Sequence, residues 1–446
     1  MNKKIGMVSL GCPKNLVDSE LMLGALKGHG YEIVTNSEDA QIIIVNTCGF
    51  IESAKQESIN TIIEMASFKK QSCELLIVTG CLAQRYRKMI LDEIPEVDAV
   101  LGTGSYSEIA SVINVAYEGS HPAIYGELEG TGYLEGERVL STGKGYAYIK
   151  IAEGCDNCCT YCVIPSLRGR FRSRRKEEIL KEAVSLAASG VKELILVAQD
   201  TTRYGLDIYG KKQLVELLQM LSSLESVEWI RLLYCYPEEI DEPFIQELVQ
   251  NNKVCKYLDI PIQHASDTIL KRMGRRGSSR DVSNLLEALR KQIPGLVLRT
   301  SLIVGFPGEM EEDFSILEAF IKKYRFDRLG VFMYSKEEDT PAAKMHDQIP
   351  AKTKKNRYGK LMRLQCLIST ENNADRLGKK YKVLVEGIAE DGIFYFGRSY
   401  AEAPDIDGLI YFTSNEPLEV GQMVFVKILN SGQYDLTGEV ENESAQ

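Results

Sequence analysis

The sequence predicts an α/β protein of three parts: an N-terminal open parallel α/β domain at residues 1–120, a central partial β/α barrel at 141–345, and a small five-stranded β-barrel at 375–442. Over the first two parts, Ile/Val/Leu runs alternate with helical patterns, which is typical of parallel sheets covered on both faces. A Gly- and Glu-rich stretch at 117–145 without clear periodicity indicates a linker with a short hairpin. From about residue 380 the apolar residues recur with a period of two, which indicates short antiparallel strands.

The composition narrows the class of protein. The chain has 446 residues, 44% of them hydrophobic, and a formal net charge of −10 at pH 7. No run approaches the roughly 18 apolar residues that a membrane span needs, and the basic start Met1–Ile5 leads into a first strand rather than a signal peptide. We therefore expect a cytoplasmic protein that is not associated with a membrane. Its acidity disfavours non-specific nucleic-acid binding and favours a basic partner.

The first domain is predicted from strands that alternate with helices. The strands are Ile5–Leu10, Gln41–Asn46, Glu74–Thr79 and Ala99–Gly102, and the helices are Leu16–Leu26, Ile51–Ser67 and one from Ala83. Cys12, Cys48 and Cys81 stand just beyond the first three strands. Because neighbouring parallel strands lie about 5 Å apart and ligands collect outside their carboxyl ends, we expect these thiols to converge on one cluster. The alternative is three separate buried or loop cysteines.

A second group of cysteines follows the apolar run Tyr146–Ala152. Cys155, Cys159 and Cys162 have a C-x3-C-x2-C spacing. Three thiolates from one loop can hold three irons of a cubic iron–sulfur cluster and leave the fourth iron open to a ligand that is not protein. Structural zinc, with Cys158 as the fourth ligand, is the alternative, but the loop lacks a paired C-x2-C partner elsewhere. We expect Cys158 to point away.

The central part is predicted to hold six β/α repeats. The strands are Tyr146–Ala152, Glu193–Ala198, Trp229–Tyr234, Tyr257–Ile262, Leu296–Val304 and Leu329–Tyr334, and the helices include Lys176–Ala188 and Glu309–Tyr324. Six repeats fit a partial TIM-like barrel, in which sites lie at the C-terminal ends of the strands. The cysteine loop, Gln199–Asp200 and His264 stand at such ends.

Three features near these strand ends are candidates for ligand contacts. The basic run Arg168–Lys176 is either a solvated turn at a helix start or a set of forked donors for a carboxylate. Gly305-Phe306-Pro307-Gly308 lets a backbone approach a ligand closely. For His264 a structural hydrogen bond is at least as well supported as catalysis, and no catalytic residue is assigned.

The C-terminal part follows a predicted connecting helix at 348–372. Its strands are Tyr381–Val385, Ile393–Phe396, Leu409–Phe412, Met423–Lys427 and Gln433–Leu436. Five short strands suit an OB-like barrel. From Asn373 to Gln446 there are six Lys/Arg and thirteen Asp/Glu residues. Such an acidic barrel is a poor clamp for tRNA and a suitable dock for a basic ribosomal protein.

With both cysteine sets, the whole chain resembles the methylthiotransferases of the radical S-adenosylmethionine superfamily, which end in a TRAM domain. The resemblance implies one 4Fe-4S cluster that cleaves S-adenosylmethionine to a 5′-deoxyadenosyl radical, and a second 4Fe-4S cluster that delivers or carries the sulfur. One S-adenosylmethionine would methylate the sulfur and another would make the radical. The implied ligands are Cys155, Cys159 and Cys162 for the first cluster and Cys12, Cys48 and Cys81 for the second; the cofactor contacts are expected at Tyr161, Gly305 and Pro307.

Two branches of that family differ in substrate. One modifies a hypermodified adenosine of tRNA, and the other modifies the β-carbon of an aspartate in ribosomal protein uS12. Val8–Asp18, Ile164–Gly169 and Ala403–Gly408 resemble the second branch. We therefore expect methylthiolation of uS12, with uS12 or the small ribosomal subunit as partner, a flavodoxin or ferredoxin as electron donor, and no tRNA. The alternatives are the tRNA enzyme of the same family and a non-catalytic zinc-binding protein.

Overall fold

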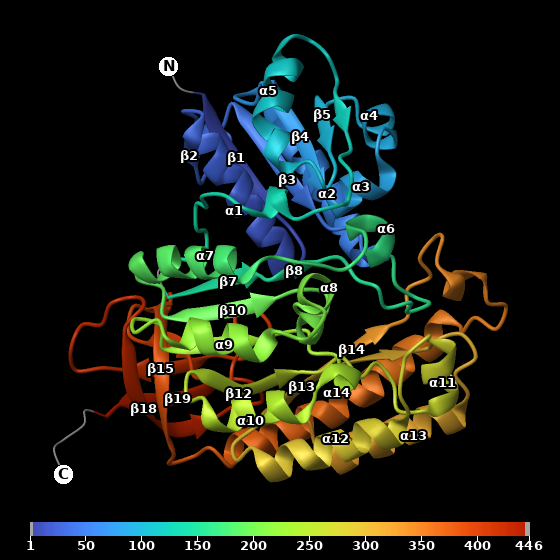
Figure 1. The fold of residues 1–446 in the computed structure, drawn as a ribbon, viewed down its shortest axis with the longest axis vertical. Helices are drawn as coiled ribbons and strands as arrows, with labels where there is room; N and C mark the ends of the chain where they lie inside the picture. Colours follow the sequence, from blue (N-terminus) through green and yellow to red (C-terminus); the bar gives the residue numbers. More distant parts are fainter. Residues whose placement is uncertain (1–2, 144, 442–446) are drawn as a thin grey trace.

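The computed structural model describes residues 3–143 and 145–441 (Figure 1). It contains two six-stranded sheets, a two-stranded sheet and a closed five-stranded barrel. Figure 1 shows the N-terminal sheet above the central sheet, with the short helix α6 (Ile164–Arg168) at their junction. No helix among the described residues is both long and apolar enough to cross a membrane.

The N-terminal sheet is parallel throughout, with the strand order β2-β1-β3-β4-β5-β6. Its strands are β1 (Lys4–Ser9), β2 (Glu32–Val34), β3 (Ile42–Thr47), β4 (Leu75–Gly80), β5 (Ala99–Leu101) and β6 (Ala123–Ile124), and its helices are α1 (Pro13–Gly28), α2 (Glu52–Ala66), α3 (Cys81–Tyr86), α4 (Met89–Glu93) and α5 (Ile109–Tyr117). The predicted parallel sheet is confirmed. Because β1, β3 and β4 are neighbours, the three cysteines that follow them lie at adjacent strand ends.

Two short strands of this sheet, β2 and β6, were not predicted from the sequence. The two residues of β6 pair in parallel with β5 and complete one edge of the sheet. The hairpin expected within 117–145 is therefore wrong for the described part of that stretch, where β6 is the strand that forms. A strand of two residues shows no periodicity, so only its neighbour in space reveals it.

The central sheet is an open, parallel, partial barrel of order β14-β13-β12-β11-β10-β7. Its strands are β7 (Tyr146–Lys150), β10 (Glu193–Val197), β11 (Trp229–Leu232), β12 (Val254–Asp259), β13 (Val297–Val304) and β14 (Arg328–Met333), and its helices are α7 (Lys176–Ala188), α8 (Leu206–Tyr209), α9 (Leu214–Ser222), α10 (Glu242–Gln250), α11 (Asp267–Arg272), α12 (Ser279–Gln292) and α13 (Glu311–Tyr324). All six predicted strands are present. The first ends at Lys150, and β8 (Ala152–Glu153) pairs separately with β9 (Arg172–Ser173).

The two faces of the central sheet pack against different partners. Side chains such as Ile149 and Leu196 face a core that includes the covering helices. Their neighbours along the strands, such as Tyr148 and Val197, belong to another core that includes Leu21 of α1 and residues of the C-terminal barrel. Since successive strand residues point to opposite faces, the second face of the open sheet is closed by the other two parts of the chain.

The C-terminal barrel closes in the order β15-β16-β17-β19-β18. Its strands are β15 (Lys380–Ile388), β16 (Tyr395–Arg398), β17 (Ile410–Thr413), β18 (Met423–Ser431) and β19 (Leu436–Val440), and it follows the long helix α14 (Ala351–Ala374). The predicted barrel and connecting helix are confirmed. The last strand was predicted too early, because Gly432 donates a backbone hydrogen bond of 2.8 Å to Asp435 and turns the chain there.

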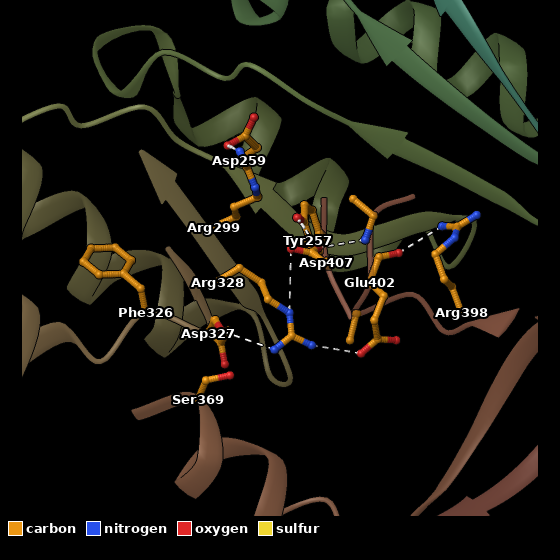
Figure 2. Close-up of polar contacts among 12 residues, drawn as sticks. Tyr257, Asp259, Arg299, Phe326, Asp327, Arg328, Ser369, Arg398, Glu402 and Asp407 are labelled. Carbon is orange, nitrogen blue, oxygen red and sulfur yellow. Dashed lines mark hydrogen bonds and ion pairs between the residues drawn. The ribbon is translucent and has the colours of Figure 1, made fainter. Parts of the chain in front are cut away.

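Buried polar contacts fix this barrel to the central sheet. The segment after β16 carries Glu402, which pairs with Arg328 at 3.1 Å, and Asp407, which accepts a 2.7 Å hydrogen bond from the hydroxyl of Tyr257. Figure 2 shows these contacts converging from the two parts of the chain. The segment is therefore held on the sheet by charges as well as by apolar packing.

Candidate functional site

The first three predicted ligands lie together at the carboxyl edge of the N-terminal sheet. Cys12 precedes α1, Cys48 follows β3, and Cys81 begins α3. Gly11 has a φ of +88°, and a Cβ built on it would lie 2.8 Å from the Cβ of Cys48 and 3.1 Å from its Sγ. Only glycine permits the ends of β1 and β3 to approach this closely. We call Cys12, Cys48 and Cys81 the N-terminal triad.

The three thiols of the N-terminal triad differ in the direction in which their surroundings shift the pKa. Burial, with the neighbouring thiols, raises the pKa of Cys48 to about 12, and burial also raises the pKa of Cys81. Burial alone would raise the pKa of Cys12, but the cations of Lys14 and Arg168 outweigh it and lower that pKa. Since the thiolate is the form that binds metal, Cys12 is the thiol best prepared to bind.

The second triad lies in the loop after β8. We call Cys155, Cys159 and Cys162 the central triad. The backbone N–H of Asn157 donates to Sγ of Cys155, and that of Ile164 donates to Sγ of Cys162, each at 3.4 Å. Burial raises the pKa of Cys155 to about 11. Amide donors aimed at sulfur are the contacts that an iron–sulfur cluster uses to spread its negative charge.

Hydrogen bonds to the end of α11 hold this loop in place. Thr160 donates its backbone N–H to the carbonyl of Met273 at 2.9 Å and its hydroxyl to the carbonyl of Arg272 at 2.8 Å. Cys158 is exposed, and its Sγ donates to the carbonyl of Asp156 at 3.7 Å. A hollow of about 180 Å³ beside Cys159 is lined by polar side chains that include Asn157, Arg203, Tyr236, Glu238 and Arg275.

The expected cofactor contacts have different surroundings. The Tyr161 ring packs edge-on against Phe306, with the centroids 6.3 Å apart. Gly305 has a φ of +71°, and a Cβ there would lie 2.3 Å from Cγ of Lys354. The Pro307 carbonyl accepts a 3.0 Å hydrogen bond from Arg272. Contacts within the chain thus account for Gly305, and cofactor binding by the three residues stays a prediction.

His264 is buried completely in the segment that follows β12. Its Nδ1 accepts a 3.0 Å hydrogen bond from the backbone N–H of Ser266. Burial lowers its pKa to about 3, so the ring is neutral at ordinary pH. This arrangement fits the structural role that the sequence analysis weighed against catalysis.

The basic run Arg168–Lys176 contains both buried and exposed residues, and its buried arginines are held by carboxylates of the chain. Arg168 is 2% exposed, and its guanidinium pairs with Asp18 at 2.8 Å and Glu153 at 2.9 Å. Arg174 is buried as well and pairs with two carboxylates, whereas the Arg170 side chain is 91% exposed. Both interpretations of the run are therefore wrong for its buried members.

One short segment connects the two triads. Helix α6 begins two residues after Cys162 and ends at Arg168, whose Nη2 donates to Sγ of Cys81 at 3.4 Å. The next residue, Gly169, accepts a 3.1 Å hydrogen bond from the backbone N–H of Cys155. The central loop therefore contacts the N-terminal triad directly.

Sequence reasoning missed the charged residues of this junction. Lys150 pairs with Asp18 and Glu153, and all three are fully buried. A lysine inside the otherwise apolar run Tyr146–Ala152 was the available signal, because a charged residue within a buried strand needs a partner. Lys14 was missed too; its Nζ lies 3.4 Å from the centroid of the Tyr234 ring.

The thiols of the two triads are not spaced as the ligands of a single metal ion. Within residues 3–143 and 145–441, no three His, Cys, Asp or Glu side chains have the spacing that one bound metal ion requires. The grouping in threes, the amide donors and the glycine at the approach of β1 and β3 fit a larger, cubic cluster with three protein ligands.

Three family models match the chain in order. They are Uncharacterized protein family UPF0004 at residues 4–102, the Radical SAM superfamily at 149–321 and the TRAM domain at 377–440. The second match carries the central triad, and the first carries the N-terminal triad. The three parts of the predicted fold are thus each matched by a family.

Curated relatives match the chain from end to end. Ribosomal protein uS12 methylthiotransferase RimO of Acetivibrio thermocellus is 60% identical over 453 residues, which cover 100% of both chains. The chain belongs to the RimO family. The RimO proteins of Clostridium tetani and of one strain of Clostridium botulinum are 51% and 54% identical, each over 99% of both chains. The predicted methylthiotransferase family is confirmed, and neither the tRNA branch nor a zinc-binding protein is favoured.

Solved structures share the fold at low sequence identity. The radical S-adenosylmethionine methyltransferase TsrM of Kitasatospora setae, with cobalamin and a 4Fe-4S cluster bound, is 16% identical with a TM-score of 0.57 over 77% of each chain. The cobalamin-dependent S-adenosylmethionine radical enzyme OxsB is 13% identical with a TM-score of 0.52, over 82% of this chain and 56% of that one. At such identities the likeness concerns the fold alone, which this RimO family member shares with both.

Proposed function

We propose that this protein methylthiolates the β-carbon of an aspartate in ribosomal protein uS12. The observation that carries the proposal is the end-to-end identity of 60% with a uS12 methylthiotransferase, in a chain that keeps two separate thiol triads. The acidic C-terminal barrel suits a basic ribosomal protein as partner. We further propose domain limits of 1–120, 141–345 and 375–442.

The donor sets fit two cluster cofactors. The central triad would hold a 4Fe-4S cluster with an iron open to S-adenosylmethionine, and the N-terminal triad would hold a second 4Fe-4S cluster. When bound, these groups and two molecules of S-adenosylmethionine supply the radical, the sulfur and the methyl group of the reaction. Tyr161, Gly305 and Pro307 are the proposed contacts of S-adenosylmethionine.

The residues of the chain position these groups and shield them from water. The backbone N–H groups of Asn157 and Ile164 donate to thiol sulfurs of the central triad, and Arg168 donates to Cys81 of the N-terminal triad. Cys155, Cys159 and Cys81 are themselves buried. Burial of this kind excludes solvent from reactive intermediates and strengthens each charge interaction inside the site.

Further partners follow from the reaction. Reductive cleavage of S-adenosylmethionine needs single electrons, for which we propose a flavodoxin or ferredoxin as the donor. The target would be met as free uS12 or on the small ribosomal subunit, in the cytoplasm.

The test is a reconstituted reaction. Anaerobically purified protein is supplied with iron, sulfide, S-adenosylmethionine and a reductant, and then with a peptide of the uS12 loop that holds the target aspartate. We expect mass spectrometry to show the gain of one methylthio group on that aspartate. Cys366→Ala, which removes a cysteine outside both triads, is the matched control and retains the gain. Modified tRNA beside unmodified peptide would overturn the proposal.

A further inference from the structure

Helix α14 is strongly basic, although the chain as a whole is acidic. Between Ala351 and Thr370 the helix holds six Lys/Arg and no Asp/Glu, whereas the chain has a net charge of −10. Three of these cations have partners within the chain, namely Lys354 with the carbonyl of Tyr334, Arg357 with Glu309 and Lys360 with Glu318.

The other three cations of α14 face solvent. Lys352, Lys355 and Arg363 are exposed, and none of them forms an ion pair with an Asp or Glu among the residues that the structure describes. Lys352 and Arg363 are eleven residues apart, which is about three turns, and Lys355 neighbours Lys352 on the helix surface. We call Lys352, Lys355 and Arg363 the basic strip; it is about 16 Å long.

A glycine stands within the basic strip. Gly359 lies seven residues after Lys352 and four before Arg363, so it shares their face of the helix. Glycine is disfavoured inside a helix, and packing within the described chain does not require it here. Outside the backbone of the helix, a Cβ built on Gly359 would meet only Nη1 of Arg363 within 4 Å, at 3.3 Å. The missing side chain leaves the surface between the cations open to a close approach from outside.

Exposed aromatic rings lie beside the basic strip. Tyr358 is 37% exposed, and Tyr434, in the turn between β18 and β19, is 49% exposed. Partial burial, with Cys366 and Tyr358 of α14, raises the pKa of Tyr434, so this second ring lies next to the helix. Exposed cations beside exposed rings are typical of surfaces that bind RNA, because the cations contact phosphates and the rings stack on bases.

The basic strip begins near the central triad. Lys354, between the first two cations of the strip, donates at 2.8 Å to the carbonyl of Tyr334, the residue after β14. The ring centroid of Tyr334 lies 5.3 Å from that of Phe306, which lies 6.3 Å from that of Tyr161 in the central loop. A partner bound along the strip therefore reaches the edge of the central sheet where the central triad lies.

We propose that the basic strip of α14 binds the ribosomal RNA of the small subunit, so that the protein meets uS12 on the subunit. The inference rests on the proposed function, because it takes uS12 as the target. An acidic protein would use the cations but not the neighbouring rings, so RNA fits this surface better. The acidic remainder of the chain repels phosphate and so confines the RNA to the strip.

The experiment compares two substrates on the reconstituted holoenzyme. One is the free uS12 loop peptide, and the other is purified small ribosomal subunits that lack the modification. Mass spectrometry follows the modification of both. Binding to the subunits and to protein-free small-subunit RNA is measured by cosedimentation at several salt concentrations. We expect wild type to bind subunits and RNA, with an affinity that falls steeply as salt rises, because each phosphate contact releases counterions.

The strip variant combines Lys352→Gln, Lys355→Gln and Arg363→Gln. The slope of log K against log salt should become smaller by about two to three, since each phosphate contact contributes about 0.7–0.9. For subunits at low salt, kcat/KM should fall about tenfold or more. For the free peptide kcat/KM should stay unchanged, because these residues belong to neither triad. Gly359→Leu should also weaken binding to the subunits, although leucine favours a helix.

A matched control combines Lys27→Gln, Lys181→Gln and Lys291→Gln. These lysines are also exposed and form no ion pair within the described part of the chain, but they belong to three different helices, α1, α7 and α12. The control therefore removes the same charge without emptying one face. It should bind subunits and RNA as wild type does.

Several results would overturn the inference. Unchanged subunit binding in the strip variant would do so, and so would an equal loss of activity on peptide and subunits. Binding to subunits that depends on the strip, without binding to protein-free RNA, would assign the strip to a ribosomal protein. If the strip variant fails to fold, Arg363→Gln alone should lower the slope by about one. A wild type that modifies neither substrate would contradict the proposed function, while the binding measurements would still decide the role of the strip.

Discussion

The guanidinium of Arg168 reaches from the central part of the chain to the sulfur of Cys81, with Nη2 at 3.4 Å from Sγ. The same guanidinium is held by Asp18 and Glu153 and also donates to the side-chain oxygen of Asn15. Arg168 thus contacts both Cys81 of the N-terminal triad and Glu153, which lies two residues before Cys155. This contact links the two triads.

Arg168→Gln should destabilise the protein strongly. The change leaves Asp18 and Glu153 buried with only Lys150 to balance them, and breaking a buried pair costs about 3–5 kcal/mol of the free energy of unfolding. Chemical denaturation of the apoprotein measures the loss. Arg170→Gln is the control, since that side chain is 91% exposed and should change the free energy by less than about 0.5 kcal/mol. Equal effects of the two substitutions would contradict the role given to Arg168.

The two triads should load iron independently. Replacing Cys155, Cys159 and Cys162 together by Ala should lower the iron content of the reconstituted protein from about eight to about four per chain, since a cubic cluster holds four irons. Reductive cleavage of S-adenosylmethionine should be lost as well. Iron and sulfide analysis and the release of 5′-deoxyadenosine are the measurements. Cys158→Ala, at the exposed cysteine of the same loop, should retain both.

Replacement of the N-terminal triad by Ala should have a different result. Cleavage of S-adenosylmethionine should continue, and insertion of sulfur into the peptide should stop. Iron analysis of Cys12→Ala, Cys48→Ala and Cys81→Ala combined should again give about four irons per chain. Retained sulfur insertion would show that these thiols do not hold a second cluster.

Arg398→Met should loosen the C-terminal barrel from the central sheet. Arg398 is fully buried and pairs with Glu193 at 2.7 Å and with Glu386 at 2.6 Å. Glu193 keeps Arg231 as a partner, so we expect a loss of about 3 kcal/mol in the free energy of unfolding, at the lower end for a buried pair. Faster limited proteolysis between α14 and β15 should accompany the loss. Lys427→Met, at a half-buried position on β18, should leave the cleavage rate unchanged.

His264 should make the protein less stable in mild acid. Its pKa is lowered to about 3 in the folded protein by burial, whereas an unfolded histidine titrates near 6.5. Between these values the unfolded chain binds the extra proton, so the stability that neutral His264 contributes is complete above pH 6.5 and falls by up to about 1.4 kcal/mol per pH unit as the pH drops. Denaturation of His264→Asn between pH 4 and 7 should show a shallower slope than wild type. An identical slope would contradict this account.

The sequence predicted the strands and the thiols because each has a local signal. The runs of Ile, Val and Leu define β3 and β4, and their ends carry Cys48 and Cys81 directly. The junction could not be predicted in this way. Asp18 and Arg168 are 150 residues apart, and whether Arg168 is solvated or buried depends on how two sheets meet. The contacts of Gly305 likewise come from Lys354, in a helix whose position no local pattern gives.

The core that closes the central sheet is shared by all three parts of the chain, with Leu21 from α1 and Ala401 and Ala403 from the C-terminal barrel meeting Tyr148 and Val197. A core with three contributors cannot be divided among independent modules. Deleting the C-terminal barrel would expose apolar surface on the central sheet, and exchanging it for that of a distant relative would require matching shapes as well as matching charges. The separation of the two triads therefore depends on packing to which all three parts of the chain contribute.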